Sequence, residues 1–328
     1  MHVISLKNNR EFQCSENETL VEAARKSGII LEHSCLSGRC SSCKVKVDSG
    51  LSEPTTAEIS LNEKDKEAGY ILSCIRAPKS DMSIQAEDLS EYGMSIPKTL
   101  PAKINKIVKL TEDVIKVELR LPPNQLLNFI AGQYVNIIKG NIKRSYSIGN
   151  TSNENGHIEL FIKKYPGGLL SNYWFNEAKI NDLLRIEGPR GTFFVRNNSG
   201  CENIVFLATG TGIAPVKSIL ESLSVLKEDF RDKNIYLFWG VRNFTDLFWS
   251  PENIGMNINY FPVLSREKNS ETYDGHVQNV LLNENIGLSN SIVYACGSND
   301  MILEAKIKLI EKGLPKNNFY SDAFVTSN

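Results

Sequence analysis

The chain has 328 residues, and a rule of roughly 100–200 residues per domain predicts two or three domains. Hydrophobic residues make up 41% and charged residues 23%, a balance that is typical of soluble globular proteins and excludes a disordered chain. With 37 Lys and Arg against 38 Asp and Glu, the net charge of -1 provides no basic surface for nucleic acid or for an anionic membrane. Without an apolar run of about 18 residues or a secretory signal, we expect a cytoplasmic protein whose cysteines do not form structural disulfides.

Four of the seven cysteines have the spacing of a plant-type [2Fe–2S] site. Cys35, Cys40 and Cys43 lie close together, and small residues between them allow the backbone to curl and aim N–H groups at a cluster. A strand expected over 70–75 brings Cys74 as the fourth ligand. The alternative is a zinc site, which usually combines one C-x2-C pair with a second pair or with histidines. None of the four histidines is placed to complete such a set, so the spacing favours iron and sulfide.

The segments around these cysteines have recognisable local patterns. We expect a hairpin around 8–9, a helix over 20–27 that ends at Gly28, and a strand over 44–48. Together with the cysteine spacing, these patterns resemble the plant-type ferredoxin module, which has a β-grasp fold. We assign this module to residues 1–92.

The next part of the chain has the pattern of a β-barrel. A linker is predicted over 88–101, where a glycine and two prolines interrupt any periodic pattern. Apolar and polar residues then alternate over 115–121, and further strands are expected over 132–138 and 157–162. Several short strands separated by turns predict an antiparallel barrel, which we assign to residues 98–198.

Three motifs follow one another within this expected barrel. They are Arg-Ser-Tyr-Ser at 144–147, a glycine turn at 165–171 that opens a helix, and Glu-Gly-Pro-Arg-Gly-Thr-Phe at 187–193. Glycines ahead of a helix let backbone N–H groups meet a phosphate, and an arginine on a neighbouring strand can supply the matching charge. In this order the motifs resemble the flavin-binding barrel of the ferredoxin–NADP reductase superfamily, and the resemblance implies bound FAD.

The resemblance also implies a role for each residue of these motifs. Arg144 would bind the pyrophosphate of FAD, and Tyr146 would lie against the isoalloxazine or the ribityl chain. Ser147 would lie near the flavin N5 as a catalytic group, with Ser145 as a further cofactor contact. The pyrophosphate would be held at the start of the helix by Gly167, Gly168 and Ser171.

The last third of the chain has the pattern of a dinucleotide-binding domain. A buried strand over 203–208 leads through a glycine turn into a helix, where a dinucleotide pyrophosphate binds in parallel-sheet domains. The turn departs from G-x-G-x-x-G because Pro215 replaces the third glycine. It resembles instead the Gly-Thr-Gly-x-Ala-Pro turn of the same superfamily. We assign a Rossmann-like parallel-sheet domain to 199–328, and the resemblance implies these NAD(P)H contacts: Gly210, Thr211, Gly212 and Pro215.

Two further strands of this domain end at candidate site residues. A strand over 235–239 runs into Arg242, and a strand over 292–295 ends at Cys296 and Gly297. In the superfamily the cysteine of a Cys-Gly pair lies beside the nicotinamide ring. The resemblance therefore implies that Cys296 belongs to the catalytic site without acting as a nucleophile.

The choice between NADH and NADPH depends on charges near the ribose. An acidic residue suits a ribose hydroxyl, and Asp246 follows Arg242 closely enough to serve. Arg266 and Lys268 can equally hold the 2′-phosphate of NADPH. We favour NADH and keep NADPH as the alternative.

The order of the three modules implies a chemical task. A nicotinamide supplies electrons in pairs, a [2Fe–2S] cluster accepts them singly, and a flavin exchanges with both. The chain is therefore expected to pass electrons from NAD(P)H through FAD to the cluster and on to a redox partner protein. A redox sensor with vestigial motifs is the contrasting hypothesis, and the intact cysteine set and the intact arginine string argue against it.

Two groups of reductases combine these modules. One is the reductase component of bacterial ring-hydroxylating and multicomponent oxygenases. The other comprises the CDP-6-deoxy-delta-3,4-glucoseen reductases, which supply electrons to a pyridoxamine-phosphate-dependent dehydrase in 3,6-dideoxyhexose synthesis. The ending at 319–325 resembles the second group, which implies that dehydrase as the partner. If the terminal aromatic of the family covers the flavin, Phe324 is the candidate.

Overall fold

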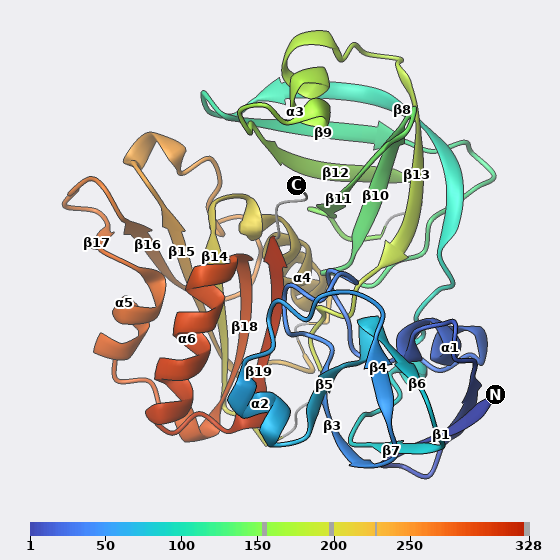
Figure 1. Cartoon of the computed structure of the whole chain (residues 1–328). Coiled ribbons are helices and arrows are strands. Elements are labelled where there is room, and N and C mark those ends of the chain that lie inside the picture. The colour runs from blue at the N-terminus through green and yellow to red at the C-terminus, as the bar shows by residue number, and fades with distance from the viewer. Residues whose placement is uncertain (153–155, 197–199, 227, 325–328) are drawn as a thin grey trace. The chain divides into compact units, whose positions relative to one another are not determined.

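The computed structural model describes residues 1–152, 156–196, 200–226 and 228–324, so Val325 of the C-terminal motif lies outside the described residues (Figure 1). The chain forms two compact units, Met1–Met94 and Ser95–Phe324, which we call the N-terminal and C-terminal units. Within the described ranges, no helix has the length and apolar character needed to cross a membrane.

The N-terminal unit has the expected β-grasp fold. Its main sheet has the strand order β2-β1-β7-β3-β5, in which β1 pairs with β2 antiparallel and with β7 parallel. A helix packs on this sheet, and a small two-stranded sheet lies beside it. The elements are β1 (His2–Leu6), β2 (Glu11–Cys14), α1 (Leu20–Lys26), β3 (Lys44–Ser49), β4 (Ser52–Pro54), α2 (Glu63–Glu67), β5 (Tyr70–Leu72), β6 (Arg76–Pro78) and β7 (Met82–Ile84).

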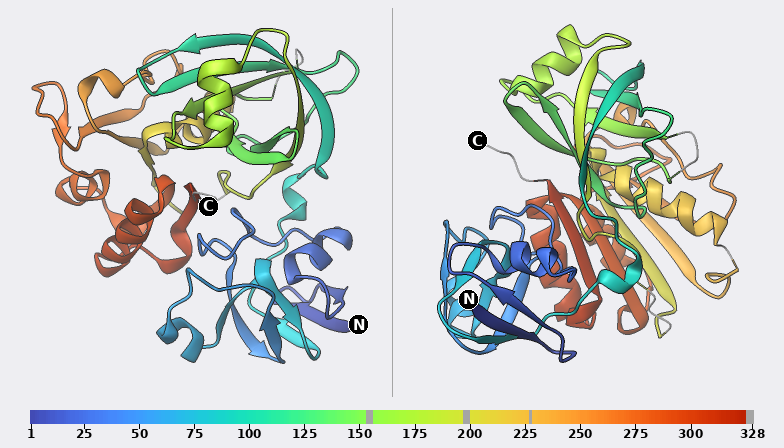
Figure 2. Two further views of the ribbon diagram at one scale, coloured as in Figure 1. Left: turned by 45° about the horizontal axis from the view of Figure 1, so that its top comes forward. Right: turned by 90° about the vertical axis from the view of Figure 1, so that its right-hand side faces the viewer.

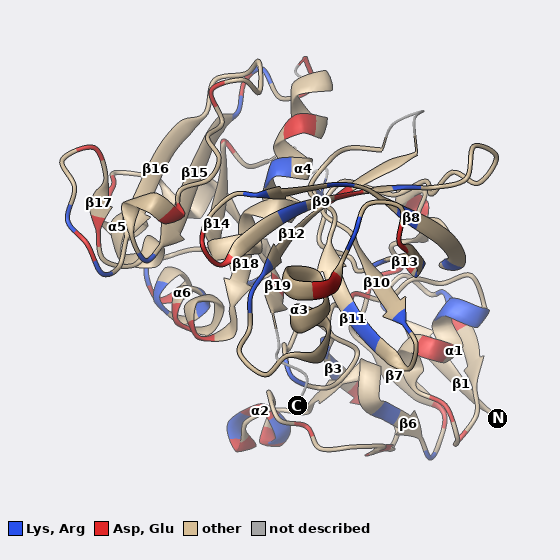
Figure 3. Cartoon of the chain, turned by 90° about the horizontal axis from the view of Figure 1, so that it is seen from above, with Lys and Arg blue, Asp and Glu red and all other residues tan. Residues whose placement is uncertain are grey.

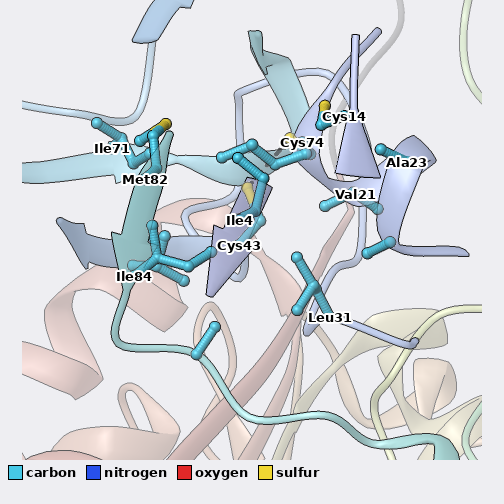
Figure 4. Close-up of a cluster of buried hydrophobic side chains, with 14 of the residues drawn as sticks. Ile4, Cys14, Val21, Ala23, Leu31, Cys43, Ile71, Cys74, Met82 and Ile84 are labelled. Carbon is cyan, nitrogen blue, oxygen red and sulfur yellow. Dashed lines mark hydrogen bonds between the residues drawn. The ribbon is translucent and has the colours of Figure 1, made fainter. Parts of the chain in front are cut away.

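Helix α1 begins and ends as the sequence predicts. The Thr19 hydroxyl accepts a hydrogen bond from the Glu22 backbone N–H, and the Glu22 carboxylate accepts one from the Thr19 N–H, which forms a capping box. Gly28 follows the helix with a φ of 75°, in the region that favours glycine. The apolar face of α1 packs into a core that also holds Cys43 and Cys74 (Figure 4).

Two expectations for this unit are corrected by the structure. The strand expected over 70–75 ends at Leu72, and Cys74 lies in the short 3-10 turn Ser73–Ile75. The predicted linker also starts too early, because the Asp88 carboxylate is buried, accepts a hydrogen bond from the Ile30 N–H at 2.9 Å and pairs with Arg10. At its other end, Lys98 already begins a strand.

The first part of the C-terminal unit is an antiparallel barrel with the strand order β11-β10-β13-β8-β9-β12. A single bridge between Ile148, just after β11, and Leu160 of β12 joins the two ends of this sheet. The apolar and polar residues of β9 alternate between buried and more exposed positions, as predicted. The elements are β8 (Lys98–Lys109), β9 (Val114–Arg120), β10 (Tyr134–Lys139), β11 (Ile142–Ser147), β12 (His157–Lys163), α3 (Leu169–Asn172), a π-helical turn (Tyr173–Glu177) and β13 (Leu183–Arg190).

The second part is a parallel sheet with the strand order β17-β16-β15-β14-β18-β19. Helix α4 covers one face, and α5 and α6 cover the other (Figures 1 and 2). The chain crosses between the faces at β14, which is the point where a doubly wound sheet binds ligands at its carboxyl edge. The elements are β14 (Asn203–Thr209), α4 (Ile213–Val225), β15 (Asn234–Val241), β16 (Asn259–Leu264), β17 (Tyr273–Asp274), α5 (Val277–Asn283), β18 (Ser291–Ser298), α6 (Asn299–Glu311) and β19 (Phe319–Phe324).

Candidate functional site

The four predicted cluster cysteines lie together as two close pairs. The sulfur atoms of Cys43 and Cys74 are 3.1 Å apart, and the Cys35 backbone N–H donates to the Cys40 sulfur at 3.5 Å. No group of three or more metal-binding side chains surrounds a single point among the described residues. Two pairs of thiols suit a cluster with two irons, because each iron takes two ligands from the protein.

One thiol in each pair ionises more easily than a free cysteine. A hydrogen bond with the Cys40 thiol, aided by the N–H groups of Ser37 and Arg39, lowers the pKa of Cys35 to about 5. The hydrogen bond with Cys43 likewise lowers the pKa of Cys74. The same hydrogen bonds, together with burial, raise the pKa of the partner thiols Cys40 and Cys43. Each pair therefore offers one thiol that readily becomes the thiolate that binds iron.

The backbone of the cysteine loop contains three left-handed positions. Leu36 and Ser41 adopt left-handed φ angles of 53° and 60°, and Gly38 adopts 71°. A Cβ atom on Gly38 would lie 2.6 Å from the Ile75 Cδ1 atom and 3.0 Å from the Ala57 carbonyl oxygen, and its φ also favours glycine. The Ser37 N–H donates to the Cys35 sulfur at 3.4 Å. These thiol pairs and inward N–H groups fit a [2Fe–2S] cluster, which the four cysteines would hold.

The arginine string lies on β11 beside the helix that follows the glycine turn. Tyr146 accepts a hydrogen bond from the Trp174 indole N–H at 3.1 Å, and the two rings meet edge to face. Burial raises the pKa of Tyr146 to about 12, against the opposing effects of Trp174 and of the Arg144 charge. The structure therefore joins Tyr146 to the helix that follows the turn, although the two motifs are separate in the sequence. The Arg144 guanidinium donates to the Lys143 carbonyl at 2.9 Å, so its contact with FAD stays a prediction.

The glycine turn borders an open pocket of about 900 Å³. Gly167, Gly168 and Ser171 line this pocket, and the Ser171 hydroxyl closes the turn by accepting from the Tyr165 N–H at 2.8 Å. Two lysines that the sequence reasoning missed, Lys139 and Lys164, line it as well. Glycine backbone and two cationic side chains fit the diphosphate of FAD.

None of the four residues of the arginine string, 144–147, lines this pocket. Ser145 donates to the Asn136 side chain at 2.7 Å, and Asn136 donates to the Glu187 carboxylate at 3.0 Å. Lys143 and Arg190 also pair with Glu187, whose pKa falls to about 2 because these hydrogen bonds outweigh the effect of its burial. This network joins β10, β11 and β13. The basic residues of β11 are blue in Figure 3.

Ser147 ends β11 and is nearly buried. Its hydroxyl makes no hydrogen bond within the described part of the chain. A hydroxyl without another hydrogen bond is available to the flavin, so the expected contact of Ser147 with the flavin N5 stays a prediction.

Replacement of Arg144 by alanine should weaken FAD binding. The lost charge-assisted contact is worth about 1.5–3 kcal/mol, so the affinity for FAD should fall about 10- to 150-fold. The FAD dissociation constant, from flavin fluorescence, is the measurement. Arg185→Ala, on the exposed side of β13 in the same barrel, is the matched control and should bind FAD as the wild type does. Equal affinity in both variants would contradict the role of Arg144.

The nicotinamide candidates gather at the carboxyl edge of the parallel sheet. Gly210–Gly212 follows β14, Arg242 follows β15, and Cys296 and Gly297 lie at the end of β18. A Cβ atom on Gly212 would lie 2.4 Å from the Cys296 carbonyl oxygen. A Cβ atom on Gly297 would likewise lie 2.1 Å from the Thr209 hydroxyl oxygen, so both loops require glycine to approach so closely.

The helix after this turn starts in the way that the sequence requires. Pro215 is the third residue of α4, in the first turn, where a missing N–H costs no helical hydrogen bond. The Trp239 indole N–H donates to the Gly210 carbonyl at 2.9 Å and fixes the other end of the turn, while Thr211 is buried within it. A cradle of glycine backbone beneath a helix start fits a dinucleotide, which these residues would hold.

Cys296 is fully buried beneath this edge, with no exposed surface. Burial and the negative charge of Asp322 raise the pKa of Cys296, which favours the protonated thiol. Asp322 lies opposite Cys296 in the register of β18 and β19, and the sequence reasoning missed it. Phe324 lies opposite Ser298 in the same register, half-buried at the end of β19.

The three candidate residues for binding the ribose or its 2′-phosphate each contact different parts of the chain. The Asp246 carboxylate accepts hydrogen bonds from the Asn243 backbone and side chain at 3.0 and 3.2 Å. Lys268 pairs with Asp274 at 3.5 Å and is 88% exposed. Arg266 is exposed, and its backbone N–H donates to the Arg242 carbonyl at 3.0 Å. The ribose contacts therefore stay predictions.

Comparisons with protein families match three models to the chain. A 2Fe-2S iron-sulfur cluster binding domain matches residues 4–79, an oxidoreductase FAD-binding domain matches 101–195, and an oxidoreductase NAD-binding domain matches 206–306. A cluster module, a flavin barrel and a nicotinamide sheet together define an NAD(P)H-dependent iron–sulfur flavoprotein reductase of the ferredoxin–NADP reductase superfamily. The protein uses a [2Fe–2S] cluster, FAD and NAD(H).

Proteins that match this chain over nearly its whole length show which reductases of this class it resembles. The chain is 42% identical over 324 residues to the CDP-6-deoxy-L-threo-D-glycero-4-hexulose-3-dehydrase reductase of Yersinia pestis, covering 96% of each protein. It is 27% identical to the xylene/toluene monooxygenase electron transfer component XylA of Pseudomonas putida, covering 96% of this chain and 91% of XylA. A cytochrome P450 reductase, GcoB of Amycolatopsis, shares the fold over 100% of both chains, with a TM-score of 0.77 and 24% identity. The chain belongs to the CDP-6-deoxy-L-threo-D-glycero-4-hexulose-3-dehydrase reductase family.

Proposed function

We propose that this reductase delivers electrons to a pyridoxamine-phosphate-dependent dehydrase for the C-3 deoxygenation of CDP-4-keto-6-deoxyhexose, a step of 3,6-dideoxyhexose synthesis. The observation that carries the proposal is the 42% identity, over 96% of the chain, to a protein named as the reductase of such a dehydrase. The three modules span residues 4–306, so a match that covers 96% of the chain takes in most of each of them.

The residues of the chain have separate tasks in this function. When bound, nicotinamide, flavin and cluster convert paired electrons into single ones. The chain positions them: the glycine turn after β14 holds the nucleotide, the pocket beside α3 holds the FAD diphosphate, and the four cysteines hold the cluster. We place the sugar on the dehydrase and assign no site for it on this chain.

NADH is the proposed donor, and the cytoplasm is the proposed location. Asp246 lies after Arg242 on the nucleotide edge, where a carboxylate suits ribose hydroxyls. No disulfide joins any of the seven cysteines, all of which lie in the described part of the chain, and this suits a reducing compartment.

An oxygenase reductase is the second candidate. The chain is 27% identical to a xylene/toluene monooxygenase component, and this match covers 96% of the chain and 91% of that protein. An identity that extends over most of both proteins favours this candidate. The lower identity makes it the less supported of the two.

The experiment is an anaerobic reaction of the dehydrase with CDP-4-keto-6-deoxyhexose, this chain and NADH, and the deoxygenated product is followed by mass spectrometry. We expect product only when both proteins are present, and faster with NADH than with NADPH. Reduction of cytochrome c by the same chain is the control for electron transfer. Cytochrome c reduction without any product would contradict the dehydrase as partner and favour an oxygenase.

A further inference from the structure

Two polar side chains of α4 bind the flavin barrel directly. The Lys217 ammonium donates to the Gly149 carbonyl at 2.7 Å, and the Ser218 hydroxyl donates to the Asn150 carbonyl at 2.7 Å. The Lys217 side chain is 12% exposed, and Ser218 is completely buried. These contacts join the nucleotide sheet to the barrel within the C-terminal unit.

The charge of Lys217 is balanced from both sides of this junction. Its ammonium lies 3.0 Å from the Glu159 carboxylate of β12 and 2.6 Å from the Glu221 carboxylate one helical turn further along α4. A nearly buried ammonium is costly unless such partners neutralise it, so its position is closely defined. The accepting peptide is also fixed, because the Gly149 N–H donates to the Glu159 carbonyl at 2.7 Å.

Both ends of this junction lie next to the proposed cofactor contacts. Gly149 comes two residues after Ser147, and Lys217 comes five residues after Gly212. The intervening segments are ordered: the Ile148 N–H donates to the Gln133 carbonyl at 3.0 Å, and the first turn of α4 joins Gly212 to Lys217. Any shift of Lys217 relative to Gly149 would therefore shift the nucleotide turn relative to the flavin strand.

We propose that Lys217 and Ser218 are positioning residues that set the alignment of the nicotinamide with the flavin. The inference rests on the proposed roles of Ser147 and the Gly210–Gly212 turn, and it is independent of which protein accepts the electrons. Electron-pair transfer requires the two rings to meet within a narrow range of distance and angle. A misplacement of about 1 Å can slow such a step about 100-fold.

Apolar contacts already hold α4 on the barrel without these polar groups. Phe161 and Phe193 of the barrel share one core with residues of α4, and a Cβ atom on Gly132 would lie 3.0 Å from the Ile219 Cδ1 atom. This packing is non-directional and permits small slips of the helix. The two hydrogen bonds to backbone carbonyls add the direction that fixes the helix in one register.

The test compares Lys217→Met, Ser218→Ala and Lys217→Arg with Lys308→Met in the FAD-loaded full chain. Lys308 is the matched control because it pairs with Glu304 one turn earlier and donates to Asn279 at 2.9 Å, all within the nucleotide domain. Stopped-flow absorbance at saturating NADH gives the limiting rate of flavin reduction. Reduction by dithionite, FAD content, and amide hydrogen exchange of 147–150 and of α4 are read in parallel.

We expect the limiting rate to fall about 10- to 100-fold in Lys217→Met and Ser218→Ala. The NADH concentration at half-saturation, the FAD content and the dithionite reaction should change little, and amide exchange of Gly149 should increase. Lys217→Arg should recover most of the rate, and Lys308→Met should match the wild type. Unchanged limiting rates in both Lys217→Met and Ser218→Ala would overturn the proposal, even if thermal stability fell. A wild type that NADH does not reduce would instead refute the proposed nucleotide site.

Discussion

Replacement of Cys43 by alanine is expected to abolish the [2Fe–2S] cluster while NADH still reduces the flavin. Cys43 is 1% exposed and its sulfur lies 3.1 Å from that of Cys74, so the variant leaves one pair with a single thiol. The flavin and nucleotide residues belong to the C-terminal unit, which is compact by itself. The loss of the cluster should therefore affect only the N-terminal unit and remove only the final electron carrier.

Iron and labile-sulfide analysis measures this result, together with the cluster absorption and the rate of cytochrome c reduction. Iron should fall from about two atoms per chain to near zero. Cys14→Ala is the matched control, because Cys14 is a fully buried thiol of the same core that lies outside the two pairs. A Cys43→Ala protein with a full iron content and the wild-type rate of cytochrome c reduction would refute the ligand assignment.

A methyl group added at Gly212 should remove nearly all activity with NADH. The new Cβ atom would lie 2.4 Å from the Cys296 carbonyl oxygen and 2.7 Å from its carbon, both of which are backbone atoms of a buried strand. The glycine turn and the end of β18 would have to separate, and the nucleotide would lose its alignment. We expect kcat/KM for NADH to fall at least about 100-fold, which corresponds to about 2.7 kcal/mol.

Gly287→Ala is the control for this substitution. Gly287 lies in the same domain, a methyl group added there would meet no heavy atom within 4 Å, and its φ of -66° suits any residue. The kinetics of flavin reduction with NADH and the FAD content of both variants are the measurements. Wild-type kinetics in Gly212→Ala would show that the nucleotide does not bind at this edge of the sheet.

Local patterns in the sequence were enough to predict the main elements. The end of α1 just before Gly28 was predictable because a glycine ends a helix through its effect on the adjacent backbone. The alternation over 115–121 predicted β9 because the period of a half-buried strand is two residues. The cysteine spacing predicted that the thiols gather at one place for a similar reason, since a short loop limits where its side chains can lie.

Features that depend on distant parts of the chain were not predicted. The Asp88 carboxylate belongs to the N-terminal unit only because Arg10 and the Ile30 N–H meet it after folding. Lys217 likewise gives no local signal, because its partner carbonyl on Gly149 is distant in the sequence. Cys74 leaves its strand for a 3-10 turn as it meets Cys43, a contact that the spacing alone does not show.

One chain is expected to hold a complete path for electrons from the nicotinamide to the cluster. Rapid mixing with NADH under anaerobic conditions, with freeze-quench electron paramagnetic resonance of the cluster at several protein concentrations, tests it most directly. We predict that the cluster becomes reduced after the flavin, at a rate that does not change with protein concentration. A cluster that stays oxidised beside a reduced flavin, or a rate that rises with protein concentration, would contradict it.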